Sequence, residues 1–304
     1  MATIVEMINP LTGLPEQVDK LDHTAQEIDD AVDLAPQLSN PNLLDNWYFG
    51  NPVNQKGQTS YTEAGYTIDR WALPPSTPGS FLLHSSDNYS ANVKGVFFQR
   101  IENKRFIVGA KYTLSVLRGL IASPTLYHET FTLTENVGWK SRFNVNGGTF
   151  GFYHDSNASD IQFDLNGDKT IIAVKLELGS QQTLAHQENG VWVLNEIPDY
   201  GGQLRLCQYY SRFFGEDIEV PCSNNPVGTH IEGTLPLTMR SGSGSISYSE
   251  GVLFTGNGTF YTVTGANVSS NGGRVKIGVN VNGQLSANMQ ATLFLKNCSI
   301  LFDL

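Results

Sequence analysis

The chain has 304 residues, of which 30 are glycine, 16% are charged and 11% are aromatic. This length predicts two or three domains. The composition is typical of many short strands joined by turns, and it argues against a long helical or a disordered protein. The formal net charge is −10. No basic stripe runs along the sequence, which argues against nucleic-acid binding.

The cysteines and the N-terminus bear on the compartment. Cys207, Cys222 and Cys298 are an odd and sparse set, which predicts buried thiols in a chain assembled in reducing cytoplasm. The first residues lack a basic start followed by an apolar core, and no run of eighteen apolar residues occurs. We therefore expect neither a signal peptide nor insertion into a membrane. If the protein works outside a cell, it leaves by lysis or inside a particle.

Residues 1–40 are predicted to form an N-terminal helical segment for oligomerisation or attachment. Their apolar residues are spaced 3, 4, 3, 4, 3, 4 and 3 apart, which is the a/d pattern of a coiled coil. These residues are Leu11, Leu14, Val18, Leu21, Ala25, Ile28, Val32 and Ala35. The helix is expected over about 15–35, with Val18, Leu21, Ala25, Ile28 and Val32 as oligomerisation residues. It either forms a parallel homotrimer or docks on its own domain.

The same segment carries most of the negative charge. Residues 1–46 hold nine acidic residues and one lysine, a net charge of −8. Acidic residues flanking the apolar stripe would repel one another in a parallel bundle. We therefore expect this surface to meet a basic partner.

Residues 41–184 are predicted to form an antiparallel β-sandwich, specifically a jelly roll. The hydrophobic period changes to two, as in Tyr112, Leu114 and Val116, and turn residues separate the runs. Eight or nine short strands without an interior helix indicate this class. The expected strands are Trp47–Phe49, Tyr66–Ala72, Gly95–Ile101, Lys111–Arg118, His128–Thr134, Ser141–Val145, Phe150–Tyr153, Asp160–Asp164 and Ile171–Leu178.

Residues 185–214 are predicted to be a connector and a helix, and residues 215–304 a second, smaller β-sandwich. Asp199 is expected to cap a helix through Gln203–Phe213. Three Asn-Gly dipeptides, at 257–258, 271–272 and 282–283, predict hairpin turns with positive φ. The expected strands are Thr234–Arg240, Ser245–Ser249, Gly251–Thr255, Thr259–Thr264, Arg274–Val281 and Ala291–Asp303.

The sequence contains no familiar catalytic or metal-binding motif. Its six histidines form neither His-x-His nor His-Glu-x-x-His, and neither Gly-x-Ser-x-Gly nor Gly-Lys occurs. Residues 164–168 resemble half of a calcium loop but lack the distal glutamate. A glycosidase needs two carboxylates across a cleft, for which the candidates are Glu129, Glu135, Asp155, Asp160 and Asp164. Acids on strands and turns are usually solvated, so we expect no catalysis, metal or cofactor.

The aromatic residues suggest glycan binding. Sugar rings present C–H faces that stack on aromatic planes, and their hydroxyls pair with polar side chains. Trp47 and Trp71 lie on alternating strands and are expected in the core. Two stretches expected to be loops combine aromatic and polar residues: 134–142 and 153–160. The candidate glycan-binding residues are Asn136, Trp139, Arg142, Tyr153, His154, Asp155 and Asn157.

Two stretches resemble the modules of a known class of proteins. The run Asn42-Leu43-Leu44-Asp45-Asn46-Trp47-Tyr48-Phe49, with the closing Lys175-Leu176-Glu177-Leu178-Gly179, resembles the sandwich module of tail and tail-fibre (receptor-binding) proteins of phages and prophages. Those modules are similar to jelly-roll carbohydrate-binding modules. Leu204-Arg205-Leu206-Cys207-Gln208-Tyr209-Tyr210 is similar to the helix that follows the module.

The resemblance covers about residues 42–240. It implies a virion tail location, a homotrimer, other tail or baseplate proteins as partners, and recognition of bacterial cell-surface polysaccharide. The resemblance implies no active site, because the matching residues form no catalytic motif. The leading hypothesis is therefore a non-enzymatic tail protein that binds host glycan. The alternatives are a purely structural baseplate or tail spacer protein, and a surface-polysaccharide hydrolase. A secreted bacterial carbohydrate-binding module is disfavoured by the missing signal peptide.

Overall fold

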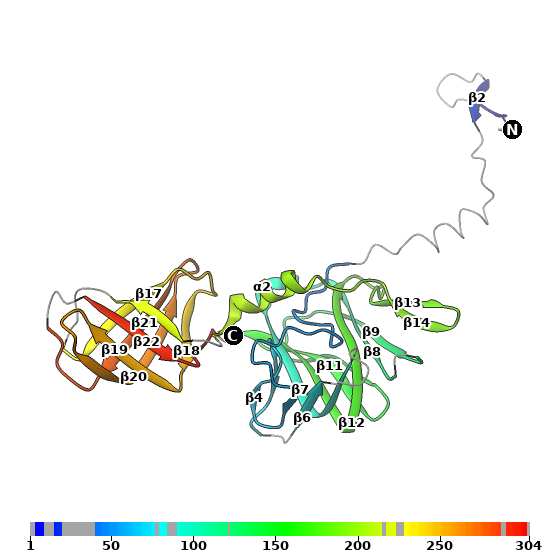
Figure 1. Cartoon of the computed structure of the whole chain (residues 1–304). Coiled ribbons are helices and arrows are strands. Elements are labelled where there is room, and N and C mark those ends of the chain that lie inside the picture. Colours follow the sequence, from blue (N-terminus) through cyan, green and yellow to red (C-terminus); the bar gives the residue numbers. More distant parts are fainter. Residues whose placement is uncertain are drawn as a thin grey trace. The chain divides into compact units, whose positions relative to one another are not determined.

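The computed structural model describes residues 4–8, 15–19, 40–76, 79–83, 90–120, 122–214, 217–222, 228–286 and 290–302. The chain divides into two units, Met1–Asn40 and Pro41–Leu304 (Figure 1). The second unit is built almost entirely from antiparallel strands. The expectation of a mainly β protein is therefore confirmed.

The first unit contains a strand pair where a helix was expected. β1 (Ile4–Ile8) and β2 (Pro15–Asp19) pair antiparallel, with Val5 opposite Val18. The helix prediction is wrong over Pro15–Asp19. β-Branched residues in β1 favour a strand, and Pro15 lies at the first position of β2, where proline is tolerated. The other predicted oligomerisation residues lie outside the described residues, so the trimer stays a prediction; they are Leu21, Ala25, Ile28 and Val32.

The second unit begins with a ten-stranded β body. Its main path runs β10-β11-β12-β7-β5-β4, while β8 joins β12 to β9 and β6 joins β7 to β3. The arrangement is consistent with a β-sandwich. The strands are β3 (Ser60–Tyr61), β4 (Gly65–Tyr66), β5 (Trp71–Leu73), β6 (Ser80–Leu83), β7 (Ala91–Glu102), β8 (Lys111–Arg118), β9 (Thr125–Thr132), β10 (Gly138–Asn144), β11 (Gly148–His154) and β12 (Ala158–Leu178), with a short 3-10 helix at Asn103–Arg105.

The long strand β12 is shared by two sets of partners. Its first half pairs with β11 and β7, and its second half pairs with β8. Two separate strands, Asp160–Asp164 and Ile171–Leu178, were expected here. Instead, the ladder with β7 shifts register between Leu165 and Lys169, with Gly167 at φ +74°. The strand bends at this bulge and continues.

Residues 42–49 lie along the second half of β12, on the edge opposite β8. The amide of Leu43 donates to the Leu176 carbonyl at 2.8 Å, and the amide of Phe49 donates to the Ile172 carbonyl at 2.9 Å. The strand expected at Trp47–Phe49 is reduced to one bridge, between Tyr48 and Ala173. These bonds position Phe49 in the core.

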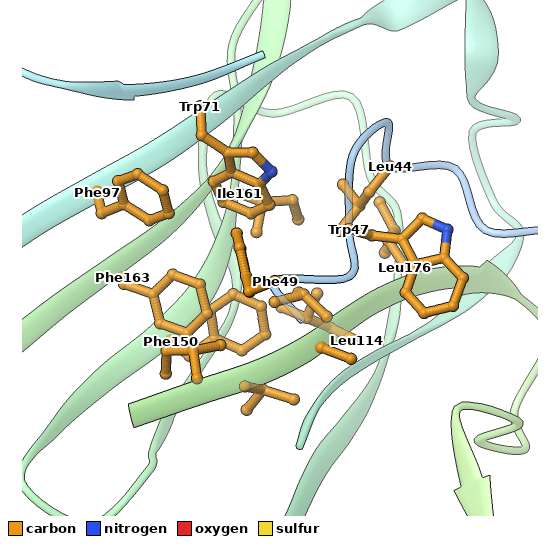
Figure 2. Packing of buried hydrophobic residues seen from close by; sticks show 14 of the residues in the cluster. Leu44, Trp47, Phe49, Trp71, Phe97, Leu114, Phe150, Ile161, Phe163 and Leu176 are labelled. Atoms are coloured by element: carbon orange, nitrogen blue, oxygen red, sulfur yellow. The ribbon is translucent and has the colours of Figure 1, made fainter. Parts of the chain in front are cut away.

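Aromatic side chains fill the core of this first β body (Figure 2). Trp71 stacks on Phe97 with ring centroids 4.9 Å apart, and Phe150 stacks on Phe163 at 4.1 Å. Phe49 packs against Trp71 at 5.3 Å. Trp47 and Trp71 are 3% and 0% exposed, which confirms their expected core placement. Full burial of each such ring stabilises the fold by about 1.5–3 kcal/mol.

The predicted connector holds a hairpin and a capped helix. β13 (Ala185–Glu188) and β14 (Val191–Leu194) are joined by Asn189 at φ +51° and Gly190 at φ +80°, the two positive values of a type I′ turn. α2 (Tyr200–Tyr210) starts after Asp199, whose carboxylate accepts a hydrogen bond from the Gly202 amide at 2.6 Å. The predicted cap is confirmed. The helix ends at Tyr210, not at Phe213, because the next residues enter a strand.

A buried ionic network ties α2 to the first β body. Asp45 lies 3.1 Å from the Nε atom of Arg70, and both side chains are 2% exposed. The Arg70 guanidinium lies 3.6 Å from the centre of the Tyr210 ring, and the second partner of Asp45 is Arg105 at 3.4 Å. The amide of Asn46 donates to the Gln203 side chain. Asp45 and Asn46 are therefore linked to α2 through Arg70 and Gln203.

A second β body with its own core follows the helix. Its nine strands run β15-β23-β18-β20-β19-β22-β16, with β21 joining β20 to β17. The strands are β15 (Ser211–Phe213), β16 (Ile218–Pro221), β17 (His230–Leu235), β18 (Gly242–Ser247), β19 (Glu250–Thr255), β20 (Phe260–Ser270), β21 (Val275–Val281), β22 (Ala291–Lys296) and β23 (Ser299–Leu301).

Three local expectations for this body are corrected. The strand expected to reach Arg240 ends at Leu235. The strand expected over Ala291–Asp303 divides into β22 and β23 around Asn297, which has φ +48°. Each Asn-Gly dipeptide was expected to supply two residues with positive φ; Gly258 and Gly272 have positive φ but the asparagines before them do not, and neither Asn282 nor Gly283 does. The last Asn-Gly dipeptide is therefore not the turn that was predicted.

Candidate functional site

Three of the predicted glycan-binding residues share one solvent-facing surface of the first β body. Trp139 and Arg142 lie on β10, and Tyr153 lies opposite Trp139 on β11. Residues three apart on a regular strand face opposite sides. A register shift between Trp139 and Ser141 adds one residue, so that Trp139 and Arg142 both point outward while Ser141 is buried. The bulge is what assembles the group.

The three side chains touch one another. The Trp139 and Tyr153 rings meet edge to face, with centroids 5.4 Å apart and planes at 77°. The Arg142 guanidinium lies 4.9 Å from the centre of the Trp139 ring. A Cβ atom on Gly151 would come within 2.9 Å of the indole, so the missing side chain lets Trp139 lie against β11. Trp139 is still 38% exposed, which leaves part of the ring open to a ligand.

Polar side chains continue this surface across β12 and β7. Asp160, Gln162 and Asp164 alternate with buried residues on β12. Asp160 binds Arg100 of β7 through two hydrogen bonds of 2.9 and 3.2 Å. Asp164 lies 3.6 Å from Arg142. Among the described residues, the side-chain amide group of Gln162 has no hydrogen-bond partner. We call the seven residues the sheet face: Arg100, Trp139, Arg142, Tyr153, Asp160, Gln162 and Asp164.

Arg100 and Gln162 were not predicted as site residues, although the sequence contains a pattern that points to Gln162. Residues 160–164 alternate strictly between polar and apolar, which predicts that Asp160, Gln162 and Asp164 share one face. Arg100 joins them only through the antiparallel register that places it opposite Asp160. That register depends on the fold, so no local pattern reveals it.

His154 does not belong to the sheet face. It follows Tyr153 on β11 and therefore points to the opposite side, where it is 7% exposed. Its Nδ1 atom lies 2.9 Å from the Ser159 hydroxyl, which donates to Asn103. Burial lowers the pKa of the His154 imidazole below its usual value. The predicted surface role is thus incompatible with its position.

The other three predicted residues lie in turns that flank the sheet face. The Asn136 carbonyl accepts a hydrogen bond from the Lys140 amine. The Asp155 carboxylate accepts one from the Ser156 hydroxyl at 3.0 Å, which lowers the pKa of Asp155. Asn157 precedes the first residue of β12. The expected loop position of Trp139 is wrong, since it is part of β10.

Two of the acids proposed for a hydrolytic pair lie on the sheet face. Asp160 and Asp164 both face outward but stand four residues apart, so their Cα atoms are separated by about 13 Å along the strand. The carboxyl groups of glycosidases lie about 5–9.5 Å apart. Each of the two is paired with an arginine, and Glu129 accepts a hydrogen bond from Ser141.

The stretch that resembles half of a calcium loop lies at the bulge of β12. Asp164 is held by Arg142, and the chain continues as a strand through Asp168. Within the described parts of the chain, no three metal-ligating side chains come together. Within the same parts, no helix has the length and apolar character needed to cross a bilayer.

Comparison of the chain with models of known protein families gives no match, and no curated protein sequence matches it.

Proposed function

We propose that this protein is a non-enzymatic attachment protein whose sheet face binds bacterial cell-surface polysaccharide. The observation that supports it is the meeting of Trp139, Arg142 and Tyr153 on one open surface. The resemblance of residues 42–240 to tail-fibre modules suggests the setting: a phage or prophage tail protein with a jelly-roll module. In this proposal it acts as a homotrimer in the virion tail, and its acidic N-terminus contacts other tail or baseplate proteins.

The chemistry of the sheet face suits a sugar chain. The exposed part of the Trp139 ring offers an apolar plane for the C–H face of a sugar, and Tyr153 forms its side wall. The Arg100–Asp160 pair is held in place by two hydrogen bonds. Polar groups fixed before binding lose little entropy when the ligand arrives. The side-chain amide of Gln162, which has no hydrogen-bond partner in the described part of the chain, can bind a sugar hydroxyl.

The test is binding of purified host cell-wall polysaccharide by the folded protein. Replacing Trp139 with alanine should weaken binding about 30-fold or more, as expected for a central aromatic contact worth about 2 kcal/mol. The matched control is Phe260→Ala, which removes an aromatic ring that is 68% exposed on β20, outside the sheet face. The control should bind like the wild type. Equal binding by Trp139→Ala would refute the proposal.

A second candidate function is a purely structural baseplate or spacer protein. Three exposed apolar residues support it: Ile197, Tyr200 and Leu206 are 70%, 43% and 47% exposed around α2. They suit contact with another protein. If this is the role, Leu206→Glu should reduce incorporation into particles. Trp139→Ala should then leave incorporation unchanged.

A further inference from the structure

A second candidate ligand site lies where the two β bodies of residues 41–304 meet. A cavity of about 300 Å³ is bounded by residues 55–69 on one side and by β15, β18 and β23 on the other. Ligand pockets between β modules are common, and this volume is at the lower end of their usual range of about 300–1,000 Å³. We call it the junction cavity.

One wall of the junction cavity is rich in hydroxyl groups, because the pairing of β15 and β18 with β23 brings serines side by side. Ser211, Leu301 and Ser245 lie side by side across the three strands, as do Phe213, Ser299 and Ser247. Both rows face the same side, because they are two residues apart. The row between them faces the other way, and its Ile300 is fully buried in the second core. The wall therefore presents four serines beside two apolar side chains.

The hydroxyl groups on this wall have hydrogen-bonding capacity to spare. The Ser247 and Ser299 oxygens lie 2.7 Å apart and share one hydrogen bond. Among the described residues, the Ser245 hydroxyl has no hydrogen-bond partner. A hydroxyl group can donate once and accept twice, so this wall can bind several hydroxyl groups of a ligand.

The opposite wall supplies a fixed carboxylate. Asp69 is 8% exposed. Its carboxylate accepts hydrogen bonds from the Gln55 amide at 2.8 Å, from the Gln55 side chain at 2.6 Å and from the Ser211 hydroxyl at 3.3 Å. These hydrogen bonds hold the carboxylate in a fixed position beside the cavity. Burial raises the pKa of Asp69 above its usual value.

Tyr66 completes the junction cavity and connects it to the sheet face. Tyr66 lies opposite Ala72, Ala72 opposite Phe98, and Phe98 opposite Gln162. The same row continues through Gly151 to Arg142. It crosses six strands, so five spacings of about 4.8 Å separate its ends by about 24 Å. A chain molecule lying across the strands would span from one site to the other.

We infer that the junction cavity is a second subsite, which takes one polyhydroxylated ring of a polysaccharide whose other units lie on the sheet face. An aromatic ring, serine hydroxyls, a carboxylate and apolar side chains in one cavity match the mixed polar and apolar surface of a sugar. The inference rests on the proposed function and adds to it. The ligand must be an extended chain, since a single sugar cannot bridge the two sites.

The experiment uses oligosaccharides of graded length, cut from the host polysaccharide and titrated against the full chain. Ser245→Tyr fills the junction cavity from an exposed position. Ser243→Tyr is the matched control, because it places the same ring two residues earlier on β18, outside the cavity lining. Tyr66→Ala empties the other wall and serves as a second variant. Circular dichroism establishes that each variant is folded.

For the wild type, affinity should rise with chain length until the oligosaccharide reaches both sites. Ser245→Tyr and Tyr66→Ala should lower the affinity for the longest chains about 10-fold, a typical loss for one buried contact, and leave short chains unaffected. Ser243→Tyr should bind like the wild type. If Ser245→Tyr and Tyr66→Ala keep full affinity while Trp139→Ala loses it, the subsite is refuted and the sheet face stands. If the wild type binds no length, both fail.

Discussion

The buried pair of Asp45 and Arg70 allows a quantitative test of how α2 is held to the first β body. Asp45→Asn keeps the shape of the side chain but removes its charge. Arg70, 2% exposed, would then have no counter-ion. Breaking a buried pair from one side costs about 3–5 kcal/mol, because the remaining charge stays desolvated.

Two features place the expected loss near the lower end of that range. Arg70 keeps its position over the Tyr210 ring at 3.6 Å, a contact worth about 2 kcal/mol when desolvated. Arg105 has a side chain that is 27% exposed, so water partly compensates the loss of its partner. We therefore expect the free energy of unfolding to fall by about 3 kcal/mol.

Urea denaturation followed by tryptophan fluorescence measures this loss of stability in the first β body. All four tryptophans lie in residues 47–192, so the signal reports on the first β body. The matched control is Asp164→Asn, the same substitution in a pair 3.6 Å apart and about half exposed. It should cost under about 1 kcal/mol. A loss below about 1 kcal/mol for Asp45→Asn, with an unchanged slope, would contradict the assigned role of the pair.

Three further changes test other parts of the fold. Glu177→Ala removes the carboxylate that accepts a hydrogen bond from the Thr183 amide at 2.7 Å; because Lys175 keeps Glu196 as a partner at 3.3 Å, the cost should be that of the unsatisfied amide, about 1–3 kcal/mol in urea denaturation. Asn189→Val places a β-branched residue at φ +51°. It should reduce the free energy of unfolding by about 1–2 kcal/mol, which a lower melting temperature would reveal. Because burial lowers the pKa of His154 from 6.5, the folded state binds fewer protons than the unfolded state. Stability should therefore fall as pH drops through about 6.5, and His154→Gln should reduce that loss when melting is compared at pH 7.5 and 5.5.

The sequence predicts the fold class well because alternation is a local signal. Tyr112, Leu114 and Val116 define β8 with its bounds as observed. The hairpin of β13 and β14 was not predicted, because each strand is only four residues long and β13 is largely polar. Its Asn189-Gly190 dipeptide was the available signal.

The candidate site is only partly visible in the sequence. Trp139, Arg142 and Tyr153 stand out by residue type, but a bulge decides that the first two share a face. Assigning His154 to the same group ignored the alternation of side chains along β11, which turns it inward. Bulges and cross-strand register arise from the assembled sheet, so the composition of a loop or strand does not reveal them.

The bonds between residues 42–49 and β12 determine when this protein can fold. The Asn42 side chain bonds to backbone atoms of Val174 and Leu176, 132 and 134 residues later in the chain. During synthesis, the first segment of the β body therefore waits for the last strand, and Trp47 and Phe49 stay in contact with water until then. Contacts so distant in sequence slow folding and favour aggregation of incomplete chains. A nascent chain that stops before Ala158 lacks the strand β12 with which β7, β8 and β11 all pair, so we expect the whole body to form in one late step after β12 has emerged.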